Sequence, residues 1–224
     1  MGYVIDVVCS DARHPVNAWL ERWSARTGAT HQVGLRRRVS ELGSGDFLFL
    51  VSCTEIVPAA VRDRYRHTLV LHGSDLPEGR GMSPVVWQVL EGREEFTVSL
   101  LDAADPFDTG DVWAKRRFRV PVAAVAAEID AALFAAEIEL MDWALEHCDA
   151  QQPVPQSGEA TYYARRRPED SRVDPDRSIA EQFDLMRVSD PERYPAFVEL
   201  RGRRFAVDLR PLDDGDGDPR PTPA

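Results

Sequence analysis

Apolar and polar positions follow two different periods along the first two thirds of the chain. Continuous apolar runs of the kind found in buried parallel strands lie at residues 3–9, 47–52 and 68–71. Apolar side chains recur at helical spacing in residues 16–27, and two shorter helices are predicted at residues 58–65 and 83–90. Residues 96–101 and 112–120 alternate like strands. This succession predicts an α/β fold with a Rossmann-like, mostly parallel sheet and flanking helices.

The longest helical pattern spans residues 122–147, as one helix or as two with a break. It carries an apolar stripe of Phe134, Ile138, Met141 and Leu145. The stripe is most simply explained as part of the core, because its members share one helix face. We therefore expect this helix to pack along the predicted sheet.

The composition changes near residue 151, where prolines and a glycine indicate a linker. Residues 178–188 predict a short amphipathic helix, with Ser178 and Glu181 placed as a capping box. A terminal β-hairpin is predicted from residues 197–200 and 205–209. The expected organisation is a Rossmann-like core at residues 1–150, a small C-terminal extension of linker, helix and β-hairpin at residues 151–212, and a disordered tail at residues 213–224.

Composition narrows the classes of function. The chain of 224 residues can bury a sizeable core, and its formal charge of −11 argues against a nucleic-acid-binding face. It has no apolar run near the ~20 residues that span a bilayer and no apparent secretory signal. The three cysteines are isolated and lack metal-ligand spacing. We therefore expect a cytoplasmic protein with reduced thiols, no metal site, and no nucleic-acid or membrane partner.

The first strand, loop and helix carry no Gly-x-Gly-x-x-Gly sequence, so a dinucleotide-binding site loses its main support. The candidate reactive residues lie in another part of the chain. An apolar run ends at His72, where a loop rich in Gly and Pro begins, and ligands of α/β proteins bind just outside such strand ends. A second loop carries Asp108, which can return to the same edge and orient the imidazole. A histidine held by a carboxylate is a ready proton acceptor near neutral pH.

Both residues also have simpler explanations. His72 can be a core histidine bonded to a loop carbonyl. Asp108 can be a turn residue, since Asp-Thr-Gly is good turn chemistry. Asp111 is a rival for the orienting role, although closing the loop is the simpler role for it. The sequence leaves these alternatives open.

Several separated blocks of the chain resemble one known family. The blocks are His-Gly-Ser-x-Leu-Pro at residues 72–77, Arg-Gly-x-x-Pro at 80–84, Trp87 with Leu-Glu-Gly at 90–92, and Asp-Thr-Gly-Asp at 108–111. In this order they resemble the core of the 10-formyltetrahydrofolate-dependent formyltransferases, which include methionyl-tRNA formyltransferase and the sugar N-formyltransferases. The resemblance implies 10-formyltetrahydrofolate as formyl donor and His72 and Asp108 as catalytic residues. It also implies a folate-facing loop made of Ser74, Leu76, Pro77, Gly79, Arg80 and Gly81.

One position departs from the family. Its third catalytic residue, an asparagine two positions before the histidine, is Val70 here, and the only asparagine of the chain is Asn17. Loss of one oxyanion donor costs about 10²–10³ in rate. Replacement donors are the N–H groups of residues 73–74, the Thr68 hydroxyl, the loop at residues 52–54, or Asn17 swinging in from the first loop. The remaining alternative is that formyl transfer has been lost.

The C-terminal part resembles the sugar N-formyltransferases in particular. The matching segments are Gln156, residues 162–170, Arg187-Val188 and residues 194–197. Full-length tRNA formyltransferases carry a larger barrel domain, for which this extension is too short. The resemblance implies that Arg166, Arg167 and Arg187 bind a pyrophosphate or carboxylate. Alternatively, these arginines tie the extension to the acidic core. Trp87 and Trp113 are more simply core residues than stacking platforms.

The resemblance thus implies an N-formyltransferase that acts on a primary amine, above all that of a nucleotide-linked amino sugar, and next that of a natural-product intermediate. Two alternatives remain. One is a folate- or nucleotide-binding homologue that has lost the reaction, and the other is a methionyl-tRNA formyltransferase. The terminal hairpin is a plausible surface for a homodimer.

Overall fold

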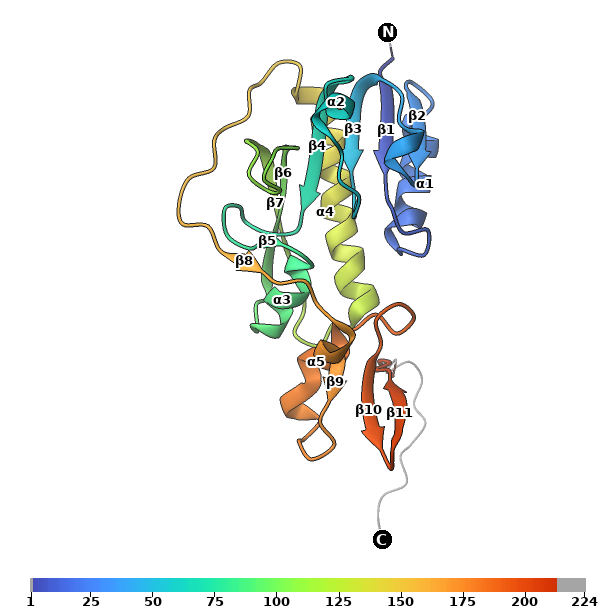
Figure 1. Ribbon diagram of the computed structural model, residues 1–224, viewed down its shortest axis with the longest axis vertical. Helices are drawn as coiled ribbons and strands as arrows, with labels where there is room; N and C mark the ends of the chain where they lie inside the picture. The colour runs from blue at the N-terminus through green and yellow to red at the C-terminus, as the bar shows by residue number, and fades with distance from the viewer. Residues whose placement is uncertain (1, 213–224) are drawn as a thin grey trace.

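The computed structural model describes residues 2–212 and is built on a six-stranded sheet in the order β2-β1-β3-β4-β6-β7 (Figure 1). Its strands are β1 (Val4–Val8), β2 (Gln32–Arg36), β3 (Gly45–Leu50), β4 (Tyr65–His72), β6 (Glu95–Asp102) and β7 (Val112–Arg119). The first four strands of the order are parallel, and β6 and β7 are each antiparallel to their neighbours. The predicted Rossmann-like, mostly parallel sheet is confirmed.

Helices α1 (Val16–Thr27) and α4 (Ala126–His147) pack on one face of this sheet (Figure 1). In α1, the buried residues Val16, Leu20 and Trp23 recur at the spacing of one helix face. The shorter helices are α2 (Ala59–Arg62), α3 (Pro84–Leu90) and α5 (Phe183–Arg187), with 3₁₀ turns η1 (Val39–Glu41), η2 (Pro168–Ser171) and η3 (Ala180–Gln182). The predicted stripe of α4 lies in or against the main core, with Phe134 and Met141 fully buried. None of the helices in residues 2–212 is long and apolar enough to cross a membrane.

The side chains of β4 alternate between the two faces of the sheet. Leu69 and Leu71 belong to the core beneath α1 and α4. Val70 packs against a separate cluster on the opposite face, which includes Leu48 and Leu50 of β3. Because side chains two residues apart share a face, Val70 lies on the same side of the sheet as His72.

After α4 the chain crosses back along the side of the sheet and reaches the loop that follows His72 (Figure 1). There, β5 (Arg80–Gly81) pairs in parallel with β8 (Tyr162–Tyr163). The end of the extension forms a three-stranded sheet of β9 (Arg172–Val173), β10 (Ala196–Leu200) and β11 (Arg203–Val207). The predicted terminal hairpin is therefore present as β10 and β11. The predicted tail at residues 213–224 lies outside the described residues.

Some boundaries differ from the prediction for physical reasons. The helix predicted at residues 58–65 is only α2, because Tyr65 instead opens β4, where it is buried and its hydroxyl donates to Asp6 Oδ2 at 2.6 Å. The helix predicted at residues 178–188 is divided into η3 and α5. Its capping box is present, since the Ser178 N–H donates to Glu181 Oε2 at 3.0 Å. Strand β2 was not predicted, because it lies at the sheet edge and its pattern is weak.

Candidate active site

His72 is the last residue of β4, is 7% exposed, and has an oxygen atom facing each of its ring nitrogens. Its Nδ1 lies 3.5 Å from Asp108 Oδ1. Its Nε2 lies 2.9 Å from the main-chain oxygen of Gly79. The structure thus brings together the two residues expected to be catalytic, one from the end of β4 and one from a loop far away in sequence. Their catalytic roles stay predictions.

The Asp108 carboxylate is held from two sides. Its backbone has φ +60, in the left-handed region that Asp tolerates better than most residues. Its Oδ2 accepts the Gly81 N–H at 2.9 Å, and its main-chain oxygen accepts the Gln156 Nε2 at 2.8 Å. Asp111, the alternative orienting residue, accepts the Asp102 N–H through its main-chain oxygen and thereby closes the loop. The loop and the extension together fix the carboxylate beside His72.

This arrangement has a consequence for the protonation of His72. A neutral imidazole carries one N–H and can donate to only one of two oxygen atoms, whereas the imidazolium donates to both. The Asp108 carboxylate and the Gly79 carbonyl can therefore both accept a hydrogen bond from the ring after it has taken a proton. Such a group can accept a proton from a substrate and hold it.

The main-chain N–H groups of the expected folate-facing loop are engaged within the protein. Gly79 N–H donates to Thr161 Oγ1 at 2.8 Å, and Arg80 N–H donates to the Thr161 oxygen at 3.0 Å. The Arg80 guanidinium donates to Gln156 Oε1 at 2.6 Å and to the Tyr162 hydroxyl at 3.1 Å. The loop is therefore tied to the C-terminal extension. Its role toward folate stays a prediction.

Both glycines of this loop are needed because Tyr163 of β8, in the C-terminal extension, packs too closely against them for a larger residue. Gly81 has φ +102, and a Cβ there would lie 2.3 Å from the Tyr163 oxygen. Gly79 has φ +71, and its Cβ would lie 2.8 Å from the Tyr163 ring. The close approach that glycine permits is thus to strand β8. Of the other predicted members of the loop, Ser74 and Leu76 are buried. A cis peptide bond joins Leu76 to Pro77.

Two exposed apolar side chains, in the loop after β3 and in the loop that carries Asp108, were not identified from the sequence. Ile56, in the loop after β3, is 67% exposed, and Phe107, next to Asp108, is 62% exposed. The signal that the sequence offered for them was a large apolar residue within an otherwise polar loop. A flat aromatic group covers such side chains favourably. Exposed apolar side chains of this kind would suit the pterin ring of the implied formyl donor.

Most of the expected replacements for the missing asparagine are already engaged. The Thr68 hydroxyl donates to the Arg62 oxygen at 3.1 Å, and the Ser74 N–H donates to the His72 oxygen at 2.9 Å. The Asn17 carboxamide donates to three main-chain oxygens of the first loop, those of Asp11, Ala12 and His14. Within residues 2–212, the hydroxyls of Ser52 and Thr54 and the N–H of Gly73 donate no hydrogen bond, so this loop and the Gly73 N–H remain the candidate donors.

The three arginines expected to bind the acceptor differ in their surroundings. Arg187 is 4% exposed, forms an ion pair with Asp184 at 2.6 Å and donates to the Ala124 oxygen, which is the alternative role of tying the extension to the core. Arg166 donates to Asp170 and Ser171 and lies over the Trp87 ring. Arg167 is exposed. Their role toward an acceptor stays a prediction.

The two tryptophans contact the protein on more than one side. Trp87 stacks on Tyr163 with ring centroids 6.2 Å apart. Trp113 packs against the main core and donates to Asp102 Oδ1 at 2.7 Å. Across residues 2–212, no group of three potential metal ligands from His, Cys, Asp and Glu comes together.

Comparison with known proteins places this geometry in a family. Residues 8–145 match the family described as formyl transferase. The methionyl-tRNA formyltransferase of Sorangium cellulosum (strain So ce56) is 33% identical over 172 residues, which cover 74% of this chain and 54% of that protein. The chain thus spans about half the length of this curated relative.

Three solved structures share the fold. Methionyl-tRNA formyltransferase from Clostridium thermocellum has a TM-score of 0.80 at 22% identity and is matched over 95% of both chains. HypX from Aquifex aeolicus in complex with tetrahydrofolic acid has a TM-score of 0.81 at 22% identity, with 93% of this chain and 38% of HypX covered. The protein Rv3404c from Mycobacterium tuberculosis, described as a likely sugar N-formyltransferase, has a TM-score of 0.71 at 18% identity, with 94% and 99% covered. On its sequence match and its fold, the chain belongs to the formyl transferase family.

Proposed function

We propose that this protein transfers a formyl group from 10-formyltetrahydrofolate to the primary amine of a small molecule. The observation that carries the proposal is the position of His72, at the carboxyl end of β4 between Asp108 Oδ1 and the Gly79 oxygen. Membership of the formyl transferase family supports it. The HypX structure with tetrahydrofolic acid supports a reduced folate as the donor.

The donor supplies an activated formyl group, and the chain supplies proton transfer and charge stabilisation. His72 takes the proton that the amine loses as its nitrogen attacks, which is worth about 10²–10⁴ in rate. Asp108 and the Gly79 oxygen hold the resulting imidazolium, which gives the proton to the leaving nitrogen as the bond between that nitrogen and the formyl carbon breaks and tetrahydrofolate departs. The positive charge of the imidazolium also favours the negative charge that develops on the formyl oxygen. The Gly79 oxygen can accept a second N–H of the amine and so orient its lone pair.

The acceptor we propose is an amino sugar, in free or nucleotide-linked form, or a related natural-product amine. The net charge of −11 supports a small molecule over a nucleic acid, because phosphates repel an acidic surface. The likeness to Rv3404c, matched over 99% of its chain, also supports it. For the nucleotide-linked form, Arg166 and Arg167 remain the proposed contacts to the pyrophosphate.

Methionyl-tRNA is the second candidate acceptor, and the observation in its favour is the 33% identity to the Sorangium protein. The absence of a large barrel from residues 151–212 does not argue against it, because the Clostridium chain is matched over 95% of its length. A gel-shift experiment with tRNA at moderate salt separates the two candidates. We expect little binding from a chain of this charge.

The direct test mixes purified protein, 10-formyltetrahydrofolate and a panel of amino sugars, nucleotide-linked amino sugars and methionyl-tRNA. Release of tetrahydrofolate is followed, and products are identified by mass spectrometry. We expect transfer to at least one amino sugar, and His72→Ala to lower kcat by about 10²–10⁴.

The matched control is His67→Ala, because His67 lies on the same strand and contacts another carboxylate, Asp149, at 3.2 Å. We expect its turnover to stay near that of the unaltered protein. Equal turnover in the His72 variant would contradict the catalytic assignment. Tight folate binding by calorimetry, without transfer to any amine, would instead support a binding protein that has lost the reaction.

A further inference from the structure

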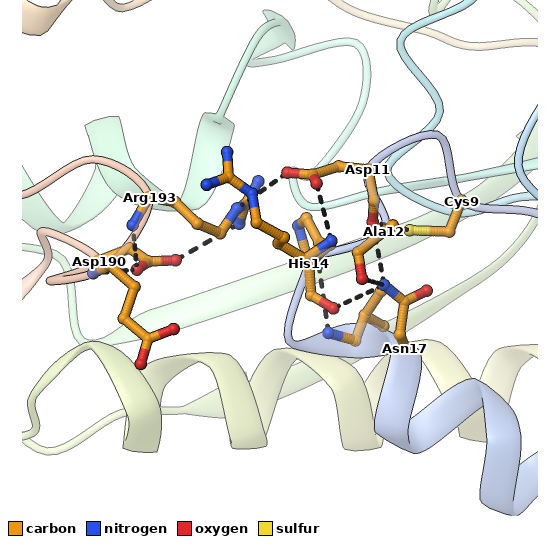
Figure 2. A network of polar contacts seen from close by, with 10 residues as sticks. Cys9, Asp11, Ala12, His14, Asn17, Asp190 and Arg193 are labelled. Carbon is orange, nitrogen blue, oxygen red and sulfur yellow. Dashed lines mark hydrogen bonds and ion pairs between the residues drawn. The ribbon is translucent and has the colours of Figure 1, made fainter.

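The C-terminal extension is joined to the core at two separate places. Near the end of β1, Arg193 contacts Asp11 Oδ2 at 3.0 Å, and it also contacts Asp190 Oδ2 at 3.5 Å (Figure 2). Within residues 2–212, no hydrogen bond or ion pair joins this contact to His72. The second place is residues 154–163, which we call the bridging segment.

The bridging segment is anchored to both loops that surround His72. At its start, Val154 and Val112 exchange both main-chain hydrogen bonds at 2.8 Å, and Val112 directly follows the loop that carries Asp108. At its end, β8 pairs in parallel with β5, which directly follows Gly79. The segment therefore runs from the loop of Asp108 to the loop whose Gly79 oxygen faces His72.

Gln156 is the inward-facing residue of this segment. Among residues 154–159 it is the only one that is not exposed. Its Nε2 donates to the main-chain oxygens of Asp108 and Gly110, each at 2.8 Å, and its Oε1 accepts the Arg80 Nη2 at 2.6 Å. Glutamine alone offers this combination among side chains of its length, because glutamate lacks the donors, and lysine and arginine lack the acceptor.

The Asp108 backbone needs such a contact. Its φ of +60 lies in the left-handed region, where a residue other than glycine persists only when its surroundings hold it. The Gly81 N–H holds Oδ2, which leaves Oδ1 at 3.5 Å from His72 Nδ1. The hydrogen bonds of Gln156 go to main-chain oxygens, so Gln156 influences the direction of the carboxylate through the backbone.

The same carboxamide connects the Asp108 loop to the loop after β4. Arg80 opens β5, and its neighbour Gly81 donates to the Asp108 carboxylate. Gln156 accepts from Arg80 while it donates to the Asp108 loop. The two loops therefore cannot move apart without breaking one of these hydrogen bonds.

We propose that Gln156 is a positioning residue, which holds Asp108 in the conformation that directs its carboxylate to His72. Gln156 acts through the backbone of the Asp108 loop and not by contact with the reacting groups. The consequence for catalysis rests on the proposed formyl transfer. The consequence for the geometry of Asp108 and His72 does not depend on it.

The first experiment removes the carboxamide. Gln156→Met keeps an unbranched side chain of similar length, and we expect kcat for formylation of the amine to fall about 100-fold, because a misplacement of about 1 Å costs this much. KM for the amine should change by less than about threefold. Gln156→Glu keeps the acceptor for Arg80 but loses both donors, and should lower kcat at least as far. Unchanged turnover in either variant would overturn the inference.

Two control variants test whether any loosening of the extension has the same effect. Arg193→Met breaks the contact with Asp11 and should lower the Tm without lowering kcat. Gln152→Met alters an exposed glutamine whose side chain takes part in no hydrogen bond within residues 2–212, and should change neither quantity. An equal fall of kcat in Arg193→Met would overturn the specific role of Gln156.

A double-mutant cycle identifies the residue through which Gln156 acts. In the Asp108→Asn background, Gln156→Met should lower kcat by less than about threefold further, because the charge that Gln156 positions is already gone. A merely structural contribution of Gln156 would be the same in both backgrounds. Multiplication of the two separate losses would therefore contradict the proposal.

A measurement without substrates separates this inference from the proposed function. The ring nitrogen signals of His72, assigned by their loss in His72→Ala, are recorded by NMR at one pH. We expect Gln156→Met to shift them in the same direction as Asp108→Asn does, and Arg193→Met to leave them in place. These shifts, without transfer to any amine, would refute the proposed function but keep the role of Gln156. Unchanged His72 signals in Gln156→Met would refute that role, whether or not the protein transfers a formyl group.

Discussion

The carboxyl ends of β4 and β1 differ in how completely their polar groups are satisfied. At β4, both nitrogens of His72 face oxygens, and both the side chain and the main chain of Asp108 accept hydrogen bonds. Near β1, the buried Oε2 of Glu137 has no partner in the described part of the chain. Completed contacts fix a reactive group in place before substrate arrives, whereas a buried carboxyl group without a partner lowers the stability of the fold. The difference separates a group that is fixed in place for chemistry from one whose burial costs stability.

The largest effect should come from breaking the completed site at Asp108. Asp108→Asn keeps an oxygen for the Gly81 N–H and tolerates the positive φ, but it removes the charge that stabilises the imidazolium. We expect kcat to fall by about 10²–10⁴ with little change in thermal stability. Steady-state kinetics measure this.

The matched control is Asp105→Asn, in the same loop, where the carboxylate instead contacts Arg62 on the surface. It should retain most of its activity. Equal losses in the two variants would mean that the loop, and not the Asp108 charge, matters for turnover.

The next effect concerns the stability that the protein loses by burying the carboxyl group of Glu137 without a partner. The pKa of Glu137 is raised from 4.5 to about 8 in the folded state, so the folded protein binds the proton more tightly than the unfolded chain. Stability from this group is therefore lost as pH rises from about 4.5 to about 8. We expect Glu137→Gln to gain on the order of 4 kcal/mol in free energy of unfolding, relative to the unaltered protein, between pH 5 and pH 9.

Urea unfolding of both proteins at the two pH values measures this relative gain. Glu139→Gln, on the exposed side of the same helix, should show no such dependence. A difference between the Glu137 variant and the unaltered protein that stays constant with pH would show that this carboxyl group is not held neutral by burial.

A smaller effect should come from the close contact between Gly81, whose N–H donates to Asp108, and Tyr163 of β8. Gly81→Ala places a Cβ 2.3 Å from the Tyr163 oxygen at φ +102, which should cost about 2–4 kcal/mol of stability and loosen the pairing of β5 with β8. Gly92→Ala is the control, because Gly92 has φ +78 but nothing within 4 Å of its Cβ position. Thermal unfolding of the two variants gives the contribution of the contact. Equal losses would mean that backbone conformation alone accounts for the effect.

Much of the fold could be predicted from local pattern. The apolar runs indicated β1, β3 and β4, and helical spacing gave α1 with the bounds that the structure has. Periodicity reports burial of one face, so strands and helices that face the core are visible in it. Strand β2 was missed for the same reason, since only two of its five side chains are large and apolar and it lies at the sheet edge.

The candidate site was predictable only in part. His72 and Asp108 could be named because they lie in blocks that resemble a family, and the structure brings them together. The sequence showed neither that Arg187 is buried in an ion pair nor that Asn17 is held within the first loop. Both contacts depend on how the chain folds around these residues, and periodicity does not report the partners of polar groups.

The sequence by itself determined the class of fold, the strand that ends at His72 and the family of the chain, because these depend on short-range pattern and on blocks of residues. The tertiary structure alone decided which polar groups are satisfied. It placed the Tyr163 oxygen against Gly81 and the carboxyl group of Glu137 in an apolar interior near Cys9. Hydrogen bonding and desolvation depend on atoms that the folded chain brings together from distant positions, and no local pattern records them.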